Sequence, residues 1–291
     1  MWVLILFGLE LFFFSSLYGL ARPRYIGFVN EHRKSLSLAI MAPVSLWLLD
    51  KLQVAERLSE PLSRVHQLMV GLYGSKSALV QTKCFMVKNL SLGLVVLMGT
   101  TLLEWAADGN AELLFYGVCL ICLIPFALYK ELAGRLQKKK RQMLLELPEV
   151  INQIVLLVNA GETVQKALLR CVERNNKAAV DTSPLLTELS QAAYQVSMNA
   201  SFAKAMEDFS KRCSLQEVSL FTTTLLLNYK RGGNELVMSL KELSTVLWEK
   251  RKSLAKTLGE EASSKMVFPM VLIFLVVMIV VASPAVIMMS H

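Results

Sequence analysis

The chain has 291 residues, of which 54% are hydrophobic and only 19% are charged, and its mean hydropathy is +0.46. This composition is too apolar for an ordinary soluble domain and predicts a membrane protein. The formal net charge of +8 does not call for a nucleic-acid partner, because membrane proteins concentrate Lys and Arg on their cytoplasmic side.

Four long apolar runs are predicted to cross the membrane as helices. Each is close to the roughly 20 residues that a spanning helix needs, and they cover residues 2–20, 85–103, 113–129 and 266–289. The first run has no basic segment before it and no clear small-residue cleavage site after it, so it is interpreted as an anchor and not as a signal peptide.

Two further features of the apolar stretches bear on their function. Residues 36–49 are too short to span, contain Pro43, and are predicted to form an interfacial or buried helix. Glu10 is an acid inside the first apolar run. An intramembrane acid is a candidate functional residue, and a contact between packed helices is the alternative interpretation.

The distribution of charge predicts how the chain is threaded. All 31 Lys and Arg residues fall within 21–88 and 130–265, whereas the link 104–112 has three acids and no base. Because bases mark the cytoplasmic side, the N-terminus, the acidic loop 104–112 and the C-terminus are expected outside. The basic segment 21–84 and the segment 130–265 are expected in the cytoplasm. Basic residues beside the bilayer also predict contact with anionic membrane lipids.

No catalytic, cofactor-binding or metal-binding constellation is found in the sequence. None of the predicted spans contains Asp, and the three His residues have no metal-ligand spacing. Five Cys residues show no disulfide framework, since three of them lie in or beside segments predicted to be cytoplasmic. The protein is therefore not expected to be an enzyme.

Residues 143–265 have the periodicity of a helical domain of about six helices. Apolar residues recur at helical spacing in successive stripes: Val164, Ala167, Leu168, Cys171 and Val172; Leu185, Leu189, Ala192 and Val196; Phe202, Ala205, Met206 and Phe209; Val218, Phe221 and Leu225; Leu236, Leu240, Leu243 and Leu247. Ser183-Pro184 predicts the start of one helix. Ser214 with Glu217 predicts a capping box for another.

The segment NYKRGGNEL at 228–236 sets two bases before a pair of glycines. It is not a P-loop, because the glycines are adjacent and a helix precedes them. Gly232 and Gly233 are predicted to form a helix-ending turn, as is Gly161 in the similar stretch LLVNAGETVQKAL. Four polar residues are candidate partner contacts, with a merely solvated turn as the alternative: Lys230, Arg231, Asn234 and Glu235.

An ordered set of segments in the second half of the chain resembles a known family. These are LPEV, NAGETVQKAL, SPLLTEL, SFAKAMEDFSKRC, LNYKRGGNEL and FPMVLIFLVV. Together they resemble the F domain of type II secretion and type IV pilus platform proteins, the GspF/PilC superfamily. Within it they are similar to a TadC-like protein of the tight-adherence (Flp) pilus system, because the chain shows one F domain instead of two in tandem.

The resemblance implies a non-enzymatic platform in the cytoplasmic (inner) membrane, with the F domain in the cytoplasm. It implies three protein partners: a secretion ATPase (TadA/CpaF-like), a second F-domain protein (TadB-like) and pilin subunits. A homo- or hetero-oligomer is expected. A sporulation-channel or competence-pilus component of the same superfamily remains an alternative, and so does a small-solute transporter.

Overall fold

The computed structural model of the chain consists of helices joined by short turns in the residues that it describes. These are residues 2–31, 41–51, 59–106, 112–178, 183–229 and 233–289, and no strand occurs among them. The predicted all-α fold class is therefore confirmed. The chain divides into two compact units, the first comprising Met1–Arg141 with Lys211–Ser214 and the second comprising Gln142–Ser210 with Leu215–His291.

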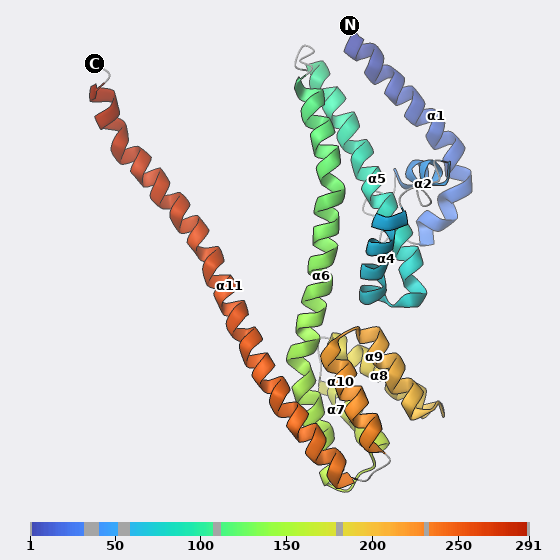
Figure 1. The fold of residues 1–291 in the computed structure, drawn as a ribbon. Helices are drawn as coiled ribbons and strands as arrows, with labels where there is room; N and C mark the ends of the chain where they lie inside the picture. The colour runs from blue at the N-terminus through green and yellow to red at the C-terminus, as the bar shows by residue number, and fades with distance from the viewer. Residues whose placement is uncertain are drawn as a thin grey trace. The chain divides into compact units, whose positions relative to one another are not determined.

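The described residues of the first unit form four helices and the beginning of a fifth, which Figure 1 labels. They are α1 (Trp2–Glu31), α2 (Ala42–Lys51), α4 (Ser59–Tyr73), α5 (Ser75–Ala106) and the start of α6 (Glu112–Asn159). The stretch predicted as an interfacial or buried helix corresponds in part to α2, while residues 36–40 lie outside the described residues. The first half of α2 is buried, and its length of about 15 Å is half of the hydrocarbon core.

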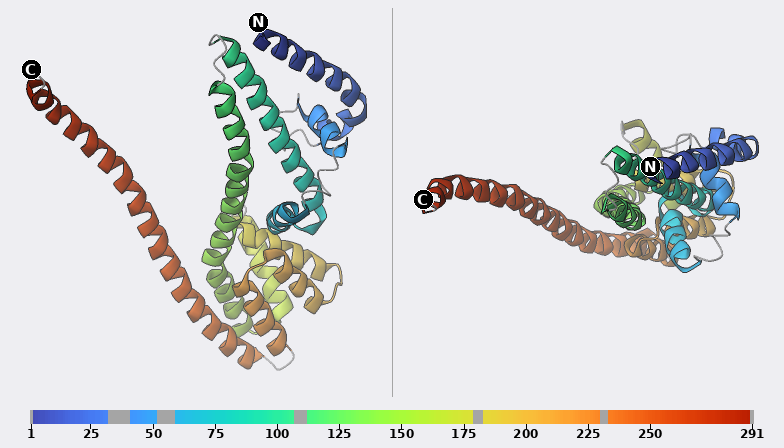
Figure 2. Two further views of the ribbon diagram at one scale, coloured as in Figure 1. Left: turned by 45° about the horizontal axis from the view of Figure 1, so that its top comes forward. Right: turned by 90° about the horizontal axis from the view of Figure 1, so that it is seen from above.

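The second unit is a helical bundle built around two long helices. Besides the end of α6, its described residues form α7 (Val164–Ala178), α8 (Pro184–Ser197), α9 (Phe202–Cys213), α10 (Gln216–Tyr229) and α11 (Gly233–Met289). Two further views show the four short helices gathered around the end of α6 and the beginning of α11 (Figure 2). The expected six helices are thus present in this part of the chain.

The bundle core is the one that the apolar periodicity predicts. Every residue of the predicted stripes is buried except Val196, which is half-buried. Each short helix therefore contributes one apolar face to a shared interior, as an amphipathic helix does in a globular domain.

Three described helical stretches are long and apolar enough to cross a membrane. They are Ser77–Glu104, Phe115–Asn159 and Glu235–Ala282, and they contain three of the four predicted spans in whole or in large part. The first predicted span forms the N-terminal part of α1, and its crossing of the membrane stays a prediction.

Two helix boundaries differ from the sequence-based expectation. The capping box places Ser214 at the start of α10, but Ser214 has a φ of +48° and its Oγ donates to the carbonyl of Lys211 at 2.9 Å. It therefore closes α9, and α10 begins two residues later. The third predicted span is continuous with the first helix of the bundle in α6, because the intervening residues are mostly strong helix formers.

Candidate functional site

The turn between α6 and α7 is a Schellman motif centred on Gly161. Gly161 has a φ of +91°, and its N–H donates to the carbonyl of Val158 at 3.0 Å. The N–H of Glu162 donates to the carbonyl of Leu157 at 3.1 Å. Both bonds satisfy carbonyls that the end of a helix leaves free, so the structure places Gly161 where a turn glycine was predicted.

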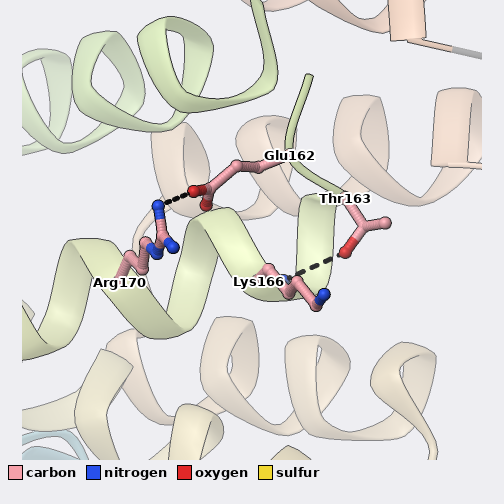
Figure 3. A network of polar contacts seen from close by, with 4 residues as sticks. All are labelled: Glu162, Thr163, Lys166 and Arg170. Atoms are coloured by element: carbon pink, nitrogen blue, oxygen red, sulfur yellow. Dashed lines mark hydrogen bonds and ion pairs between the residues drawn. The ribbon is translucent and has the colours of Figure 1, made fainter. Parts of the chain in front are cut away.

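Polar side chains surround the start of α7 (Figure 3). Thr163 Oγ1 accepts from the N–H of Lys166 at 3.4 Å, as an N-cap residue does. The Glu162 carboxylate forms an ion pair with the guanidinium of Arg170. The Arg170 side chain remains 66% exposed whereas that of Glu162 is 15% exposed. The carboxylate therefore holds a charged side chain at the surface.

The candidate contact residues of NYKRGGNEL are described in part. Lys230, Arg231 and Gly232 lie outside the described residues. Gly233 is the first residue of α11, and Asn234 follows it in the helix, with a side chain outside the described set. Glu235 is exposed in the first turn of α11. An acid there stabilises the helix through its dipole.

The structure brings together the two stretches that look alike in sequence. Gln165 in the first turn of α7 donates from Nε2 to the hydroxyl of Tyr229 at 3.0 Å. Tyr229 is the last residue of α10, and the centre of its ring lies 5.0 Å from that of Phe202. The α6–α7 turn and the end of α10 therefore form one surface, which we call the distal face: Glu162, Thr163, Gln165, Lys166, Arg170 and Tyr229.

The beginning of α11, around which the short helices gather (Figure 2), lies far along this helix from its apolar part. The helix is continuous from Gly233 to Met289, so Glu235 is separated from Met266 by about 46 Å of helix. This separation exceeds the roughly 8 Å Debye length in physiological salt. Charges at the beginning of α11, such as Glu235, are therefore electrostatically screened from its apolar segment.

Partly buried polar groups join α6 to α7 and α11 in the bundle. Ser244 Oγ donates to Asn152 Oδ1 at 2.7 Å, and Asn175 Nδ2 donates to Gln153 Oε1 at 2.7 Å. Cys171 Sγ lies 3.3 Å from the same Gln153 oxygen. Burial raises the pKa of the Cys171 thiol to about 11, so the thiol is protonated at neutral pH and is a poor nucleophile.

Glu10, the intramembrane acid, has a partner in a neighbouring helix. Thr101 Oγ1 of α5 donates to Glu10 Oε2 of α1 at 2.9 Å. A hydrogen bond between apolar helices favours the interpretation of Glu10 as a packing contact.

The chemistry that the distal face offers is that of binding. Its groups are an ion pair, a lysine, a phenol and amide or hydroxyl donors. Within the described residues, no group of three or more His, Cys, Asp and Glu is placed to hold a metal ion.

Two contacts of the distal face were not predicted from the sequence. The Glu162–Arg170 pair is eight residues apart, which is outside the spacing that a single helix brings together. The Gln165–Tyr229 contact joins distant parts of the chain. No local pattern in the sequence encodes this meeting.

These observations define an all-helical membrane protein whose C-terminal unit combines a six-helix bundle with an apolar helix. Residues 150–284 match the family model described as type II secretion system (T2SS), protein F. The match supports the GspF/PilC superfamily of secretion and pilus-assembly platform proteins for this part of the chain. No curated protein and no solved structure matches the chain.

Proposed function

We propose that the protein is a non-enzymatic platform in the cytoplasmic membrane for assembly of a tight-adherence (Flp) type pilus, or for a related type II-like secretion process. The observation that carries this proposal is the match of residues 150–284 to the protein F family, in a chain with long apolar helices. In this proposal the bundle lies in the cytoplasm, the N-terminus and the link 104–112 lie outside, and α11 leads from the bundle into the membrane.

The proposed partners are a secretion ATPase of the TadA/CpaF type, a second F-domain protein of the TadB type, and pilin subunits. The distal face suits the ATPase contact, because it is polar, includes the exposed Lys166 and Arg170, and belongs to the bundle, where α11 begins about 46 Å before its apolar segment. Lys230, Arg231, Asn234 and Glu235 are proposed to extend this contact.

The continuous α11 suggests how the platform works. A helix that is packed in the bundle at Leu236, Leu240 and Leu243 and apolar from Met266 onward transmits a displacement of the bundle to the membrane. Gly259 lies between these two parts, is exposed, and has open space where a Cβ would stand. Inserting a flexible linker at Gly259 is therefore expected to abolish assembly without unfolding the bundle. Intact assembly would contradict rigid coupling.

A deletion strain scored for surface filaments tests the function itself. Loss of filaments, with recovery of an ATPase and a second F-domain protein when the native chain is purified in detergent, is the expected result. Retained filaments without such partners would contradict the proposal.

The contact residues are tested by replacing Lys230, Arg231, Asn234 and Glu235 together with Ala while the glycines stay. The matched control replaces Lys204, Lys241, Gln191 and Glu207, which are exposed elsewhere on the bundle. We expect the first variant to lose ATPase recovery and the second to keep it. Equal recovery would mean that NYKRGGNEL is a solvated turn.

A further inference from the structure

Two contacts fix how three helices of the first unit lie against one another. Thr101 of α5 hydrogen-bonds Glu10 of α1 at 2.9 Å. A Cβ added at Gly117 of α6 would lie 2.7 Å from Cγ2 of Thr100 in α5. Since Thr100 and Thr101 are neighbours, Glu10 and Gly117 lie at one level, which we call the pinned level.

A second pair of contacts, nearer the other end of α5, confirms that both pairs are antiparallel. Tyr25 and Val29 of α1 belong to a cluster with Cys84 and Val87 of α5. Phe85 of α5 packs on a cluster that contains Leu132 of α6. In both pairs, residues nearer the start of α5 therefore lie beside residues with higher numbers in the partner helix, and the two shifts are similar in length.

This register places three basic residues at a common level. On each helix we take the first basic residue that follows the pinned level in the direction of Phe85. These residues are Arg22 on α1, Lys88 on α5 and Lys130 on α6. Each is roughly twelve or thirteen residues away, which corresponds to about 18–20 Å of helix. Three separate sequence segments thus supply a positive charge at the same height.

The distance from this level to the other ends of the helices equals the thickness of a bilayer core. The far ends of α1, α5 and α6 are Trp2, Ala106 and Glu112. Each end is about 27–30 Å of helix away from the basic residue on the same helix. The hydrocarbon core of a bilayer is about 30 Å thick. Arg22 and Lys130 are exposed and Lys88 is half-buried.

Aromatic side chains accompany the bases. The guanidinium of Arg22 lies 5.9 Å from the centre of the Tyr18 ring, and Tyr129, next to Lys130, is 37% exposed. Tyr is enriched where a membrane helix passes through the headgroup region. Among the described carboxylates, none forms an ion pair with Arg22, Lys88 or Lys130, so no described acid competes with an anionic ligand for these charges.

We propose that Arg22, Lys88 and Lys130 form a basic collar in the headgroup plane of the cytoplasmic leaflet, where they bind the phosphates of anionic lipids. In this arrangement α1 crosses the bilayer together with α5 and α6. The collar goes beyond the proposed assembly function, because it holds whichever filament or substrate the platform serves.

The first test measures the depth of the three positions in the bilayer. Arg22→Cys, Lys88→Cys and Lys130→Cys are spin-labelled one at a time in a full chain in which the exposed Cys119 and Cys122 are replaced by Ala. In vesicles of phosphatidylcholine with phosphatidylglycerol, the three labels are expected at headgroup depth, within about 3 Å of one another. A label at Leu97→Cys serves as the control and is expected about 14 Å deeper than the one at position 88. Any collar label as deep as this control would overturn the proposal.

The second test measures how much anionic lipid the protein retains. It uses charge-removing variants of the folded protein. Wild-type protein in nanodiscs of the same mixture is released in detergent, and the bound phosphatidylglycerol is counted by native mass spectrometry. Each base near the surface contributes about a fivefold preference for anionic lipid, so Arg22→Gln with Lys88→Gln and Lys130→Gln should weaken retention on the order of 100-fold.

The matched control changes the same net charge away from the collar, with Arg174→Gln, Lys204→Gln and Lys241→Gln, all exposed on the bundle. It is expected to retain lipid like the wild type. Equal losses in both triple variants would show an effect of net charge alone, and unchanged retention in the collar variant would show no site; either result would overturn the proposal.

Discussion

The bundle of the second unit and the apolar helices use hydrophobic residues in opposite ways. In the bundle, Phe209, Phe221 and Leu168 are almost completely buried, because removing apolar surface from water drives the helices together. In α11, every described residue from Ala262 to Ala282 is exposed, because its apolar side chains suit lipid. Helices in lipid lack this driving force and associate through small residues and hydrogen bonds. The two regions should therefore fail under different substitutions.

The largest expected effect is a loss of core packing in the bundle. Phe221→Ala removes a side chain that is fully buried, and such truncations cost about 3–5 kcal/mol. The thermal unfolding midpoint of the full chain in detergent, measured as the loss of helicity of the bundle, should fall markedly. Phe268→Ala is the matched control, since Phe268 is 74% exposed, and it should leave that transition in place. A similar shift in both variants would break the comparison.

The bundle core could be predicted from the sequence because helical periodicity is a local property. The five predicted stripes needed only the spacing of apolar residues within each helix. The contacts Gln165–Tyr229 and Glu10–Thr101 depend on which helices meet and in which register, and no local pattern encodes this. Ser214 was misassigned for a related reason: two helix ends fall within three residues, and the hydroxyl bonds the helix that it closes and not the one that it precedes.

The close approach of α5 and α6 predicts the next effect. Gly117→Ala places a Cβ 2.7 Å from Cγ2 of Thr100, which forces two packed helices apart and should cost about 1–3 kcal/mol. Gly99→Ala adds the same methyl group on α5 where nothing lies within 4 Å.

Cross-linking yield between cysteines placed on α5 and α6 reports this contact directly. It should fall for Gly117→Ala and not for Gly99→Ala. An unchanged yield in the Gly117 variant would mean that small residues do not determine helix packing in the first unit.

Backbone conformation gives a smaller effect, with opposite signs at two glycines of the second unit. Gly161 has a φ of +91°, so Gly161→Ala is strained and should destabilise the bundle by about 1–2 kcal/mol. Gly259 lies inside α11 with open space around it, and Gly259→Ala should stabilise that helix by roughly 0.5–1 kcal/mol. Urea denaturation followed by circular dichroism separates the two, and a stabilising Gly161→Ala would contradict the Schellman turn.

The hydrogen bond between Glu10 and Thr101 should give the smallest effect, although it joins two apolar helices where water is absent. Interhelical hydrogen bonds in membranes contribute about 0.6 kcal/mol on average and rarely more than about 1.7 kcal/mol, because the separated helices find other partners. Thr101→Val keeps the shape of the side chain and removes the donor, and Glu10→Leu removes the acceptor while leaving an apolar residue. A double-mutant cycle on the unfolding of the first unit measures their coupling. Thr100→Val is the control: the hydroxyls of both threonines lie within hydrogen-bond distance of the Leu97 carbonyl in their own helix, and among the described contacts that of Thr101 also reaches Glu10. Coupling well above this range would mean that Glu10 acts as more than a packing contact. Coupling indistinguishable from that of Thr100 would show that the α1–α5 contact depends on side-chain shape and lipid alone.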